Sequence, residues 1–142
     1  VARLTTVSGA GDPLVLPICY VVAGDTVYSA IDAKPKRVPV QRLKRLRNIM
    51  ENPRVALVID DYSEDWSRLA YVMLHGRAEI VLQGPEFEDA IVKLREKYPQ
   101  YQSMPIERNP LIAVRLTRAV SWQAGGRPGP CGRVGRAAPP PR

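Results

Sequence analysis

The chain has 142 residues, of which 45% are hydrophobic and 25% charged, and its formal net charge is +7. This composition is that of an ordinary globular protein and is unlike that of a disordered chain. Four arginines and no acids fall in segment 123–142, so the rest of the chain carries a net charge of only +3. The basicity therefore gives little support to a nucleic-acid-binding function.

The cysteines, the single histidine and the apolar runs argue against a disulfide-rich protein, a metal-binding protein and a membrane-spanning protein. Cys19 lies in an apolar segment and Cys131 in the arginine-containing tail, so a disulfide framework is not expected and a reducing compartment is favoured. With His75 as the one histidine and no C-x-x-C pair, we expect no metal site. No apolar run approaches the ~18 residues of a membrane-spanning helix. We expect a cytoplasmic protein with no membrane partner.

The first third of the chain predicts strands joined by tight turns. Its breaks, SGAGD and GD, contain the glycine and aspartate that favour hairpin turns. The expected strands are 2–7 (ARLTTV), 13–23 (PLVLPICYVVA) and 26–31 (TVYSAI).

Residues 39–52 have a helical period, with Pro39 at the start and Pro53 just beyond the end. The apolar residues that this period places on one side are Leu43, Leu46, Ile49 and Met50. The basic residues expected on the solvated arc are Arg42, Lys44, Arg45 and Arg47.

The remaining segments predict three strands and a second helix. Strand 54–62 is apolar on both faces, and strand 69–82 contains Gly76, which indicates a bend or bulge. Helix 85–98 (PEFEDAIVKLREKY) precedes a last strand, 111–122. The predicted fold is mainly β (α+β), a six-stranded antiparallel barrel with two flanking helices. It occupies residues 1–122, and 123–142 is predicted to be a disordered Gly/Pro/Arg-rich tail.

No catalytic carboxylate pair, nucleophile motif or phosphate-binding glycine loop is present, so the catalytic residues stay unassigned. The acidic loop around Asp60 is interpreted as solvated, and His75 as a structural or rim residue. The basic run divides in two. Lys34, Lys36 and Arg37 lie between a strand end and a helix, where they are expected to bind a phosphate, whereas Lys44 and Arg45 are expected to be solvated.

Several motifs together resemble one known family. They are VYSAIDAKPKR (27–37), NPRVALVIDDY (52–62), DWSRL (65–69) and HGRAEIV (75–81), after an opening hairpin at 1–20. This combination resembles the flavin and deazaflavin oxidoreductases of the pyridoxamine 5'-phosphate oxidase-like split barrel, over residues 1–122. The branch that it is most similar to uses coenzyme F420, a 5-deazaflavin hydride carrier.

The resemblance implies a homodimer with cofactor sites at the interface and a reductase that transfers hydride from reduced F420 to an unidentified unsaturated small molecule. It implies the following contacts: Tyr28, Ser29 and Ala30 along the cofactor, Lys34, Lys36 and Arg37 at its phosphate, Leu16, Pro17 and Ile18 beside the ring, and Trp66 and Arg68 covering it. Tyr28, Tyr71 and His75 are candidate proton donors, because each could reach a cleft.

The sequence leaves alternatives open for the identity of the cofactor and for the function. The segment PLVLPICY lacks the cations of the pyridoxamine oxidase proper, so F420 is favoured and FMN is the second candidate. A protein that carries F420 without catalysis would have the same pocket. An RNA-binding module would use the basic helix and the arginine-containing tail, but it would need exposed aromatic residues to stack on bases.

Overall fold

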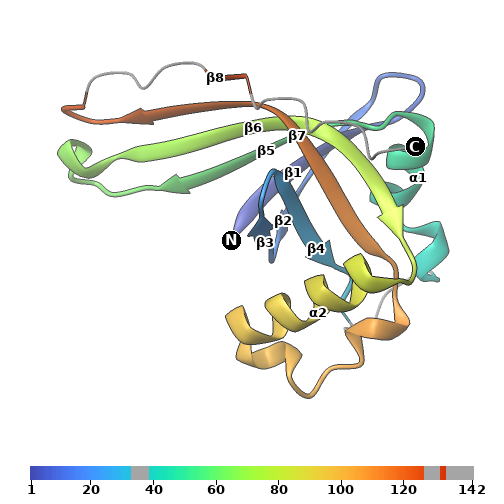
Figure 1. Cartoon of the computed structure of the whole chain (residues 1–142). Helices are drawn as coiled ribbons and strands as arrows, with labels where there is room; N and C mark the ends of the chain where they lie inside the picture. Colours follow the sequence, from blue (N-terminus) through green and yellow to red (C-terminus); the bar gives the residue numbers. More distant parts are fainter. Residues whose placement is uncertain (33–38, 127–131, 134–142) are drawn as a thin grey trace, which may run out of the picture.

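Antiparallel strands account for most of this structure, a computed structural model that describes residues 1–32, 39–126 and 132–133 (Figure 1). The strands are β1 (Ala2–Val7), β2 (Pro13–Ile18), β3 (Val21–Ala23), β4 (Thr26–Ala30), β5 (Arg54–Asp61), β6 (Ala70–Val81), β7 (Leu111–Gln123) and β8 (Gly132–Arg133). The α-helices are α1 (Lys44–Glu51) and α2 (Pro85–Lys97), and four 3-10 turns are η1 (Val40–Arg42), η2 (Trp66–Arg68), η3 (Pro99–Tyr101) and η4 (Ile106–Arg108).

The predicted class, mainly β with two flanking helices, is confirmed, but the described residues form eight strands, where six were predicted. The expected strand 13–23 is divided at Cys19–Tyr20 into β2 and β3, because β2 pairs with β1 whereas β3 pairs with β4. The two-residue strand β8 pairs with β7 inside the segment predicted to be a tail, most of which lies outside the described residues.

The strand order, β2-β1-β5-β6-β7-β4-β3, shows how the sheet curls. Strands β2 and β3 stand at opposite ends of this order, yet only Cys19 and Tyr20 separate them in the chain. The two edges of the sheet therefore come together in a half-barrel that is split where they meet. Proline at positions 13 and 17 suits β2 to an edge, because proline has no N–H for a second ladder.

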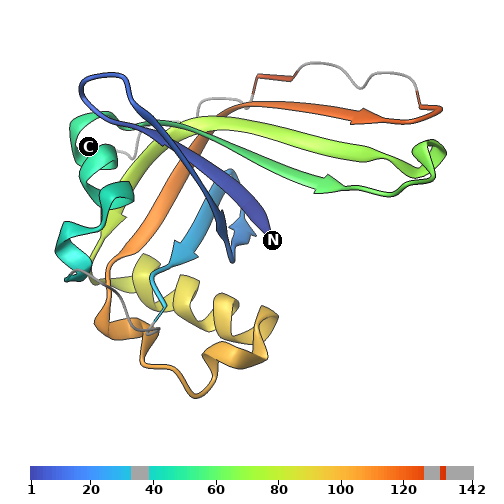
Figure 2. The same cartoon turned by 180° about the vertical axis from the view of Figure 1, so that it is seen from behind.

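The long strands β5, β6 and β7 continue past the curled part as an extended arm (Figures 1 and 2). The 3-10 turn η2 lies at its far end, where Asp61 pairs with Ala70 and the chain returns. We call this projecting part of β5, β6 and β7, with the turn between β5 and β6, the arm.

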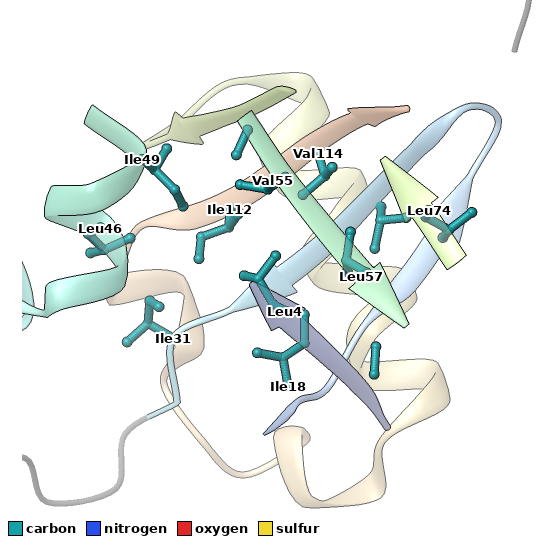
Figure 3. Packing of buried hydrophobic residues seen from close by; sticks show 13 residues of the cluster. Leu4, Ile18, Ile31, Leu46, Ile49, Val55, Leu57, Leu74, Ile112 and Val114 are labelled. Atoms are coloured by element: carbon teal, nitrogen blue, oxygen red, sulfur yellow. The ribbon is translucent and has the colours of Figure 1, made fainter. Parts of the chain in front are cut away.

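Two apolar clusters hold the helices on the sheet. Helix α1 packs on β1 and β6 through Leu46 and Ile49, which lie over Val55 and Ile112 of the sheet (Figure 3). Helix α2 packs on β3 and β4 through an apolar stripe, with Phe87, Ile91 and Leu94 buried. Burial of such side chains stabilises each helix by about 1.5–3 kcal/mol per residue, which is more than helix propensity supplies.

The predicted irregularity at Gly76 is confirmed, since the pairing of β6 with β7 shifts register between His75 and Gly76. A Cβ atom at Gly76 would lie 2.5 Å from the carbonyl oxygen of Arg115 and 2.8 Å from Cγ1 of Val114. No side chain fits there without movement of the β7 backbone, so the bulge depends on glycine.

Gly76→Ala should destabilise the protein by about 1–3 kcal/mol, because its methyl group would push β7 away from β6. Urea unfolding followed by circular dichroism measures the change. Gly126→Ala is the matched control, because the nearest atom to its new Cβ would be 3.4 Å away. Equal stability of the two variants would contradict a glycine-dependent bulge.

Candidate functional site

A pocket of about 230 Å³ lies at the split of the half-barrel. It is formed where the end of β2 meets the end of β4, with α1 and the turn η3 completing its walls. The lining residues are Val1, Pro17, Ile18, Cys19, Ser29, Ala30, Asp32, Arg45 and Tyr101. The split therefore brings together residues that are far apart in the sequence.

Four of the predicted cofactor contacts meet in this pocket: Pro17, Ile18, Ser29 and Ala30. The other described ones lie elsewhere. Leu16 is paired with Leu4 of β1, and Tyr28 faces helix α2. Trp66, 72% exposed, and Arg68 are on η2 at the far end of the arm. Lys34, Lys36 and Arg37 lie outside the described residues.

The corner between β2 and β3 is fixed by the end of helix α2. The Tyr98 hydroxyl accepts a hydrogen bond from the Tyr20 backbone N–H at 3.0 Å and donates one to the Tyr20 carbonyl oxygen at 3.1 Å. Lys97 Nζ donates to the same carbonyl at 2.8 Å and stands 3.6 Å from the centre of the Tyr20 ring. Tyr20 belongs neither to the β1–β2 ladder nor to the β3–β4 ladder, and these contacts satisfy its backbone N–H and carbonyl groups.

Arg45 enters the pocket because the buried face of helix α1 contains Leu46 and Ile49, as expected, but extends away from Met50 to the opposite side of the predicted stripe. Arg45 and Asn48 lie on the inward side with Ile49, whereas Met50 is 76% exposed. The buried Asn48 amide donates to the Thr6 hydroxyl of β1 at 3.0 Å, and this bond holds the helix in that rotation. The expectations that Met50 is buried and Arg45 is solvated are therefore wrong.

The guanidinium of Arg45 is only partly satisfied among the described residues. Its Nε is buried and has no hydrogen-bond partner there. Burial lowers the pKa of Arg45, while the charge of the pocket residue Asp32 acts in the opposite direction. A buried N–H donor of a cation is costly to leave unpaired, so this nitrogen marks a place where an acceptor would bind.

Tyr101 provides a protonated hydroxyl at the pocket wall. Burial raises its pKa well above the ordinary value, and a hydrogen bond to the Cys19 side chain and the charge of Asp32 add to this. The Arg95 side chain fixes the turn that carries Tyr101 by donating to the Tyr101 and Met104 carbonyl oxygens at 3.1 Å each. At neutral pH the Tyr101 hydroxyl is thus available as a hydrogen-bond donor.

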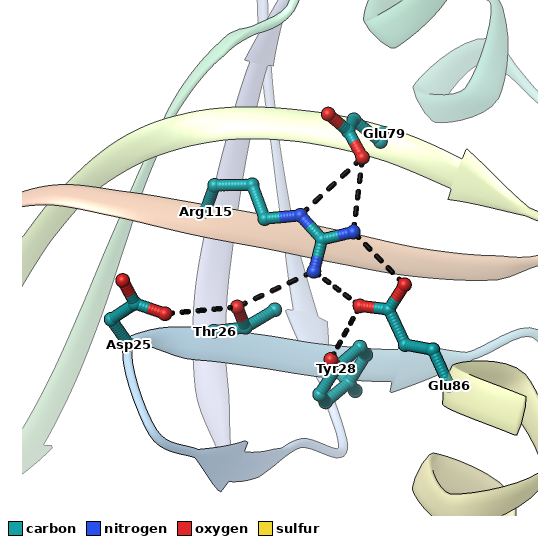
Figure 4. A network of polar contacts seen from close by, with 6 residues as sticks. All are labelled: Asp25, Thr26, Tyr28, Glu79, Glu86 and Arg115. Carbon is teal, nitrogen blue, oxygen red and sulfur yellow. Dashed lines mark hydrogen bonds and ion pairs between the residues drawn. The ribbon is translucent and has the colours of Figure 1, made fainter. Parts of the chain in front are cut away.

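Tyr28 belongs to a separate polar network on the α2 side (Figure 4). Its hydroxyl donates to Glu86 Oε1 at 2.6 Å, and Arg115 forms ion pairs with both Glu86 and Glu79. The hydrogen bond from Arg115 is the main reason that the pKa of Glu86 is below its ordinary value. The network joins β4, β6, β7 and the first turn of α2.

The three candidate proton donors all lie away from this pocket. Tyr28 is bound to Glu86, His75 lines a different pocket, and Tyr71 stacks on Trp122 of the arm with ring centres 5.9 Å apart. The pocket residues missed from the sequence are Arg45, Asp32, Cys19 and Tyr101. Cys19 and Asp32 follow the ends of β2 and β4 and Arg45 is in α1, so their positions could have indicated them, whereas Tyr101, in η3, gave no signal in the sequence.

Metal-ligand clusters and membrane-spanning helices are both absent from the described residues. Within 1–32, 39–126 and 132–133, no three His, Cys, Asp or Glu side chains are grouped as metal ligands would be. No helix in the described part of the chain has the length and apolar character needed to cross a membrane.

Comparison with known proteins gives a family match over most of the chain. A family model described as pyridoxamine 5'-phosphate oxidase matches residues 1–123. Among curated proteins, no match was found.

Solved structures share the fold. A heme binding protein from Mycobacterium smegmatis gives a TM-score of 0.70 at 21% identity, covering 89% of this chain and 50% of its own. A conserved hypothetical protein from Mycobacterium tuberculosis gives 0.68 at 22% identity, covering 87% and 77%. A heme storage protein from Vibrio cholerae gives 0.59 at 15% identity, covering 81% and 78%. The chain thus spans half the length of the first of these, and at such identities the likeness concerns the fold alone.

The Glu86 network predicts a pH-dependent stability. Glu86→Gln should lower the free energy of unfolding by about 1 kcal/mol at pH 7, because the carboxylate is partly exposed and the loss is moderated by water. Since the folded-state pKa is depressed, this contribution is full above the ordinary value of 4.5 and is lost as pH falls through the folded-state pKa.

Urea unfolding of both proteins between pH 3 and pH 8 measures the difference. Glu88→Gln is the control, because Glu88 is an exposed carboxylate in the same first helical turn. A Glu86→Gln effect that stayed constant down to pH 3 would contradict the ionic role of Glu86.

Proposed function

The chain belongs to the pyridoxamine 5'-phosphate oxidase family, and from this membership we propose that it is an oxidoreductase that binds a flavin or deazaflavin at the split of its half-barrel. The observation that carries the proposal is the pocket that combines apolar walls with the unpaired, buried Nε of Arg45. Such a site suits a planar apolar ring attached to an anionic group.

Arg45 is the proposed contact for the cofactor's phosphate. A phosphate oxygen would supply the acceptor that Nε lacks, and charge-assisted hydrogen bonds of this kind are among the strongest in proteins. The predicted phosphate residues Lys34, Lys36 and Arg37 precede α1 in the chain and are kept as additional contacts of the proposal. Arg45 is added to them on the basis of its burial.

The size of the pocket supports a site shared between two chains. Its volume of about 230 Å³ is below the ~300–1,000 Å³ usual for small-molecule sites, so one chain would enclose only part of a flavin. Trp66 and Arg68, on the far end of the arm, would reach a cofactor only in a partner chain. Both observations favour the homodimer with interfacial sites that the sequence predicts.

Between the two cofactors, coenzyme F420 is preferred and FMN is the alternative. Strand β2 presents no cation to the pocket, whereas basic residues are frequent between positions 34 and 47. One terminal phosphate needs two or three cations, and a longer run suits the phosphodiester and carboxylates of the deazaflavin. A hydride carrier that does not bind its acceptor would have the same pocket, so turnover must be measured separately.

In this proposal the cofactor supplies hydride transfer and the chain supplies its placement. Arg45 binds the phosphate, while Pro17, Ile18 and Ala30 provide an apolar wall that excludes water from one side of the ring. The Ser29 and Tyr101 hydroxyls are the neutral donors available to orient the ring's polar edge. No catalytic acid is assigned.

Heme is the weaker candidate, although two of the compared proteins are named for it. Histidine is a common protein ligand of heme iron, and His75, the chain's one histidine, lies at another pocket. Heme binding at the split would have to use a different ligand, such as Cys19 or Tyr101.

The cofactor assignment predicts tighter binding of F420 than of FMN to the purified protein. Fluorescence anisotropy of each cofactor measures its Kd, and heme binding is followed by absorbance in parallel. Arg45→Ala should raise the Kd of the preferred cofactor about 10- to 100-fold, because it removes a charge-assisted contact. Arg47→Ala, an exposed neighbour on the same helix, should change it less than about twofold.

The outcomes of these experiments test separately the choice of cofactor, the site and the reaction. Tighter binding of FMN or heme would overturn the choice of F420, and equal losses in the two variants would overturn the site. Mixing reduced F420 with a panel of enones, quinones and imines tests the reaction. Tight binding without oxidation of the cofactor would indicate a carrier.

The arm predicts the oligomeric state. Its large exposed apolar side chains include Tyr71 and Trp122, and these two line a pocket of about 390 Å³. We expect a second copy to cover them, since stable dimers bury about 800 Å² per chain around aromatic residues. Light scattering should then give twice the chain mass of 15.8 kDa.

Tyr71→Ser together with Trp122→Ser should shift the protein towards monomers and weaken cofactor binding at the same time, because each site needs both chains. Val92→Ser, a 55% exposed position on α2, is the control and should remain dimeric. A monomeric wild-type protein that binds the cofactor fully would overturn the shared site.

A further inference from the structure

A second pocket, of about 450 Å³, lies on the sheet beside the Gly76 bulge and shares no residue with the pocket at the split. Its lining is strongly basic: Arg54 of β5, His75 and Arg77 of β6, and Arg118 of β7. None of the described residues that line it is acidic. We call these four side chains the basic pocket.

The pairing of the strands places like charges directly opposite one another. Arg54 is the cross-strand partner of Arg77. Opposed like charges destabilise a sheet, so this arrangement works against the fold unless an anion lies between them. Among the described residues, neither Arg54 nor Arg77 has an ion pair.

Glu79, two residues from Arg77 along β6, is already engaged. Arg77 also lies opposite Arg115 of β7, and Glu79 and Glu86 are both paired with that arginine. Glu79 and Glu86 are thus engaged with Arg115, and neither forms an ion pair with Arg54 or Arg77 among the described residues. This contrast distinguishes the basic pocket from an ordinary surface on which charges of both signs alternate.

The bulge gives the basic pocket its concave form. The register shift after His75 leaves Thr117 without a partner across the strands, and its hydroxyl donates to the His75 carbonyl oxygen at 3.2 Å. Bulges bend a strand and re-aim the side chains beside them, here those of His75 and Arg77.

We propose that the basic pocket is a binding site for a small phosphorylated molecule, separate from the cofactor pocket. Guanidinium groups match phosphate oxygens in a forked geometry, and those of Arg54 and Arg77 together supply more charge than one carboxylate would need. The volume exceeds that of a lone phosphate ion, so the site takes a pyrophosphate or a phosphate ester together with part of its organic group. Among the described lining residues, His75 has the one aromatic ring, which disfavours stacked nucleic-acid bases.

Isothermal titration with inorganic pyrophosphate tests the proposal on the full chain. We expect saturable binding, one ion per chain, that is tighter than binding of inorganic phosphate. The Kd should rise at least about tenfold in Arg54→Gln/Arg77→Gln. It should change less than about twofold in Arg47→Gln/Arg108→Gln, which removes the same charge from exposed positions outside both pockets.

Thermal unfolding distinguishes a ligand site from a structural cluster. Because it relieves the opposed charges, Arg54→Gln/Arg77→Gln should melt at the same or a higher temperature than the wild type without ligand. Pyrophosphate should raise the melting temperature of the wild type and not that of this variant. In the single variant Arg77→Gln, the rise in melting temperature caused by pyrophosphate should lie between those of the wild type and the double variant.

Three results would overturn the proposal. The first is the absence of saturable pyrophosphate binding, and the second is an equal loss of pyrophosphate affinity in the control Arg47→Gln/Arg108→Gln. The third is a lower melting temperature of Arg54→Gln/Arg77→Gln than of the wild type without ligand. If a single-stranded oligonucleotide bound more tightly than pyrophosphate, and the double variant lost this binding, the ligand of the basic pocket would be a nucleic acid and not a small molecule. Arg45→Ala should leave pyrophosphate binding unchanged, so this site and the proposed function succeed or fail separately.

Discussion

The corner at Cys19–Tyr20 is the constraint on which the rest of the structure depends. There the chain leaves one edge of the sheet and joins the other, so neither ladder can satisfy its backbone groups. A single hydroxyl, that of Tyr98, both accepts from and donates to Tyr20, and Lys97 completes the set. By holding the two edges together without pairing them, the end of α2 creates the split and the pocket within it.

Much of the fold follows from local patterns in the sequence. Alternating strands, the stripe of α2 and the bulge at Gly76 are each set by residues close together in the chain, and all are found. The corner was missed because PLVLPICYVVA has the composition of one continuous strand, and only the different partners of its halves divide it. Tertiary pairing overrides propensity at that point.

The candidate site was harder to predict than the fold. The family resemblance predicted cofactor contacts around Ile18 and Ser29, and the structure brings these two segments together in one pocket. Arg45 was expected to be solvated, because the apolar period of α1 leaves two rotations open, one that buries Met50 and one that turns Arg45 and Asn48 inward. The buried bond from Asn48 to Thr6 decides between them, and a sequence does not show a partner 42 residues away.

The pairing of β4 with β7 also determines at what point of synthesis the sheet can be completed. Thr26 finds its partner in Arg115, 89 residues later, whereas β1 and β2, or β5 and β6, are close neighbours in the chain. During synthesis the early strands β3 and β4 must wait until the last long strand has left the ribosome, and joining distant segments is slow. The order of strands thus ties β3 and β4, in the first third of the chain, to β7 in its last third, so that side of the sheet forms only after nearly the whole chain has been made.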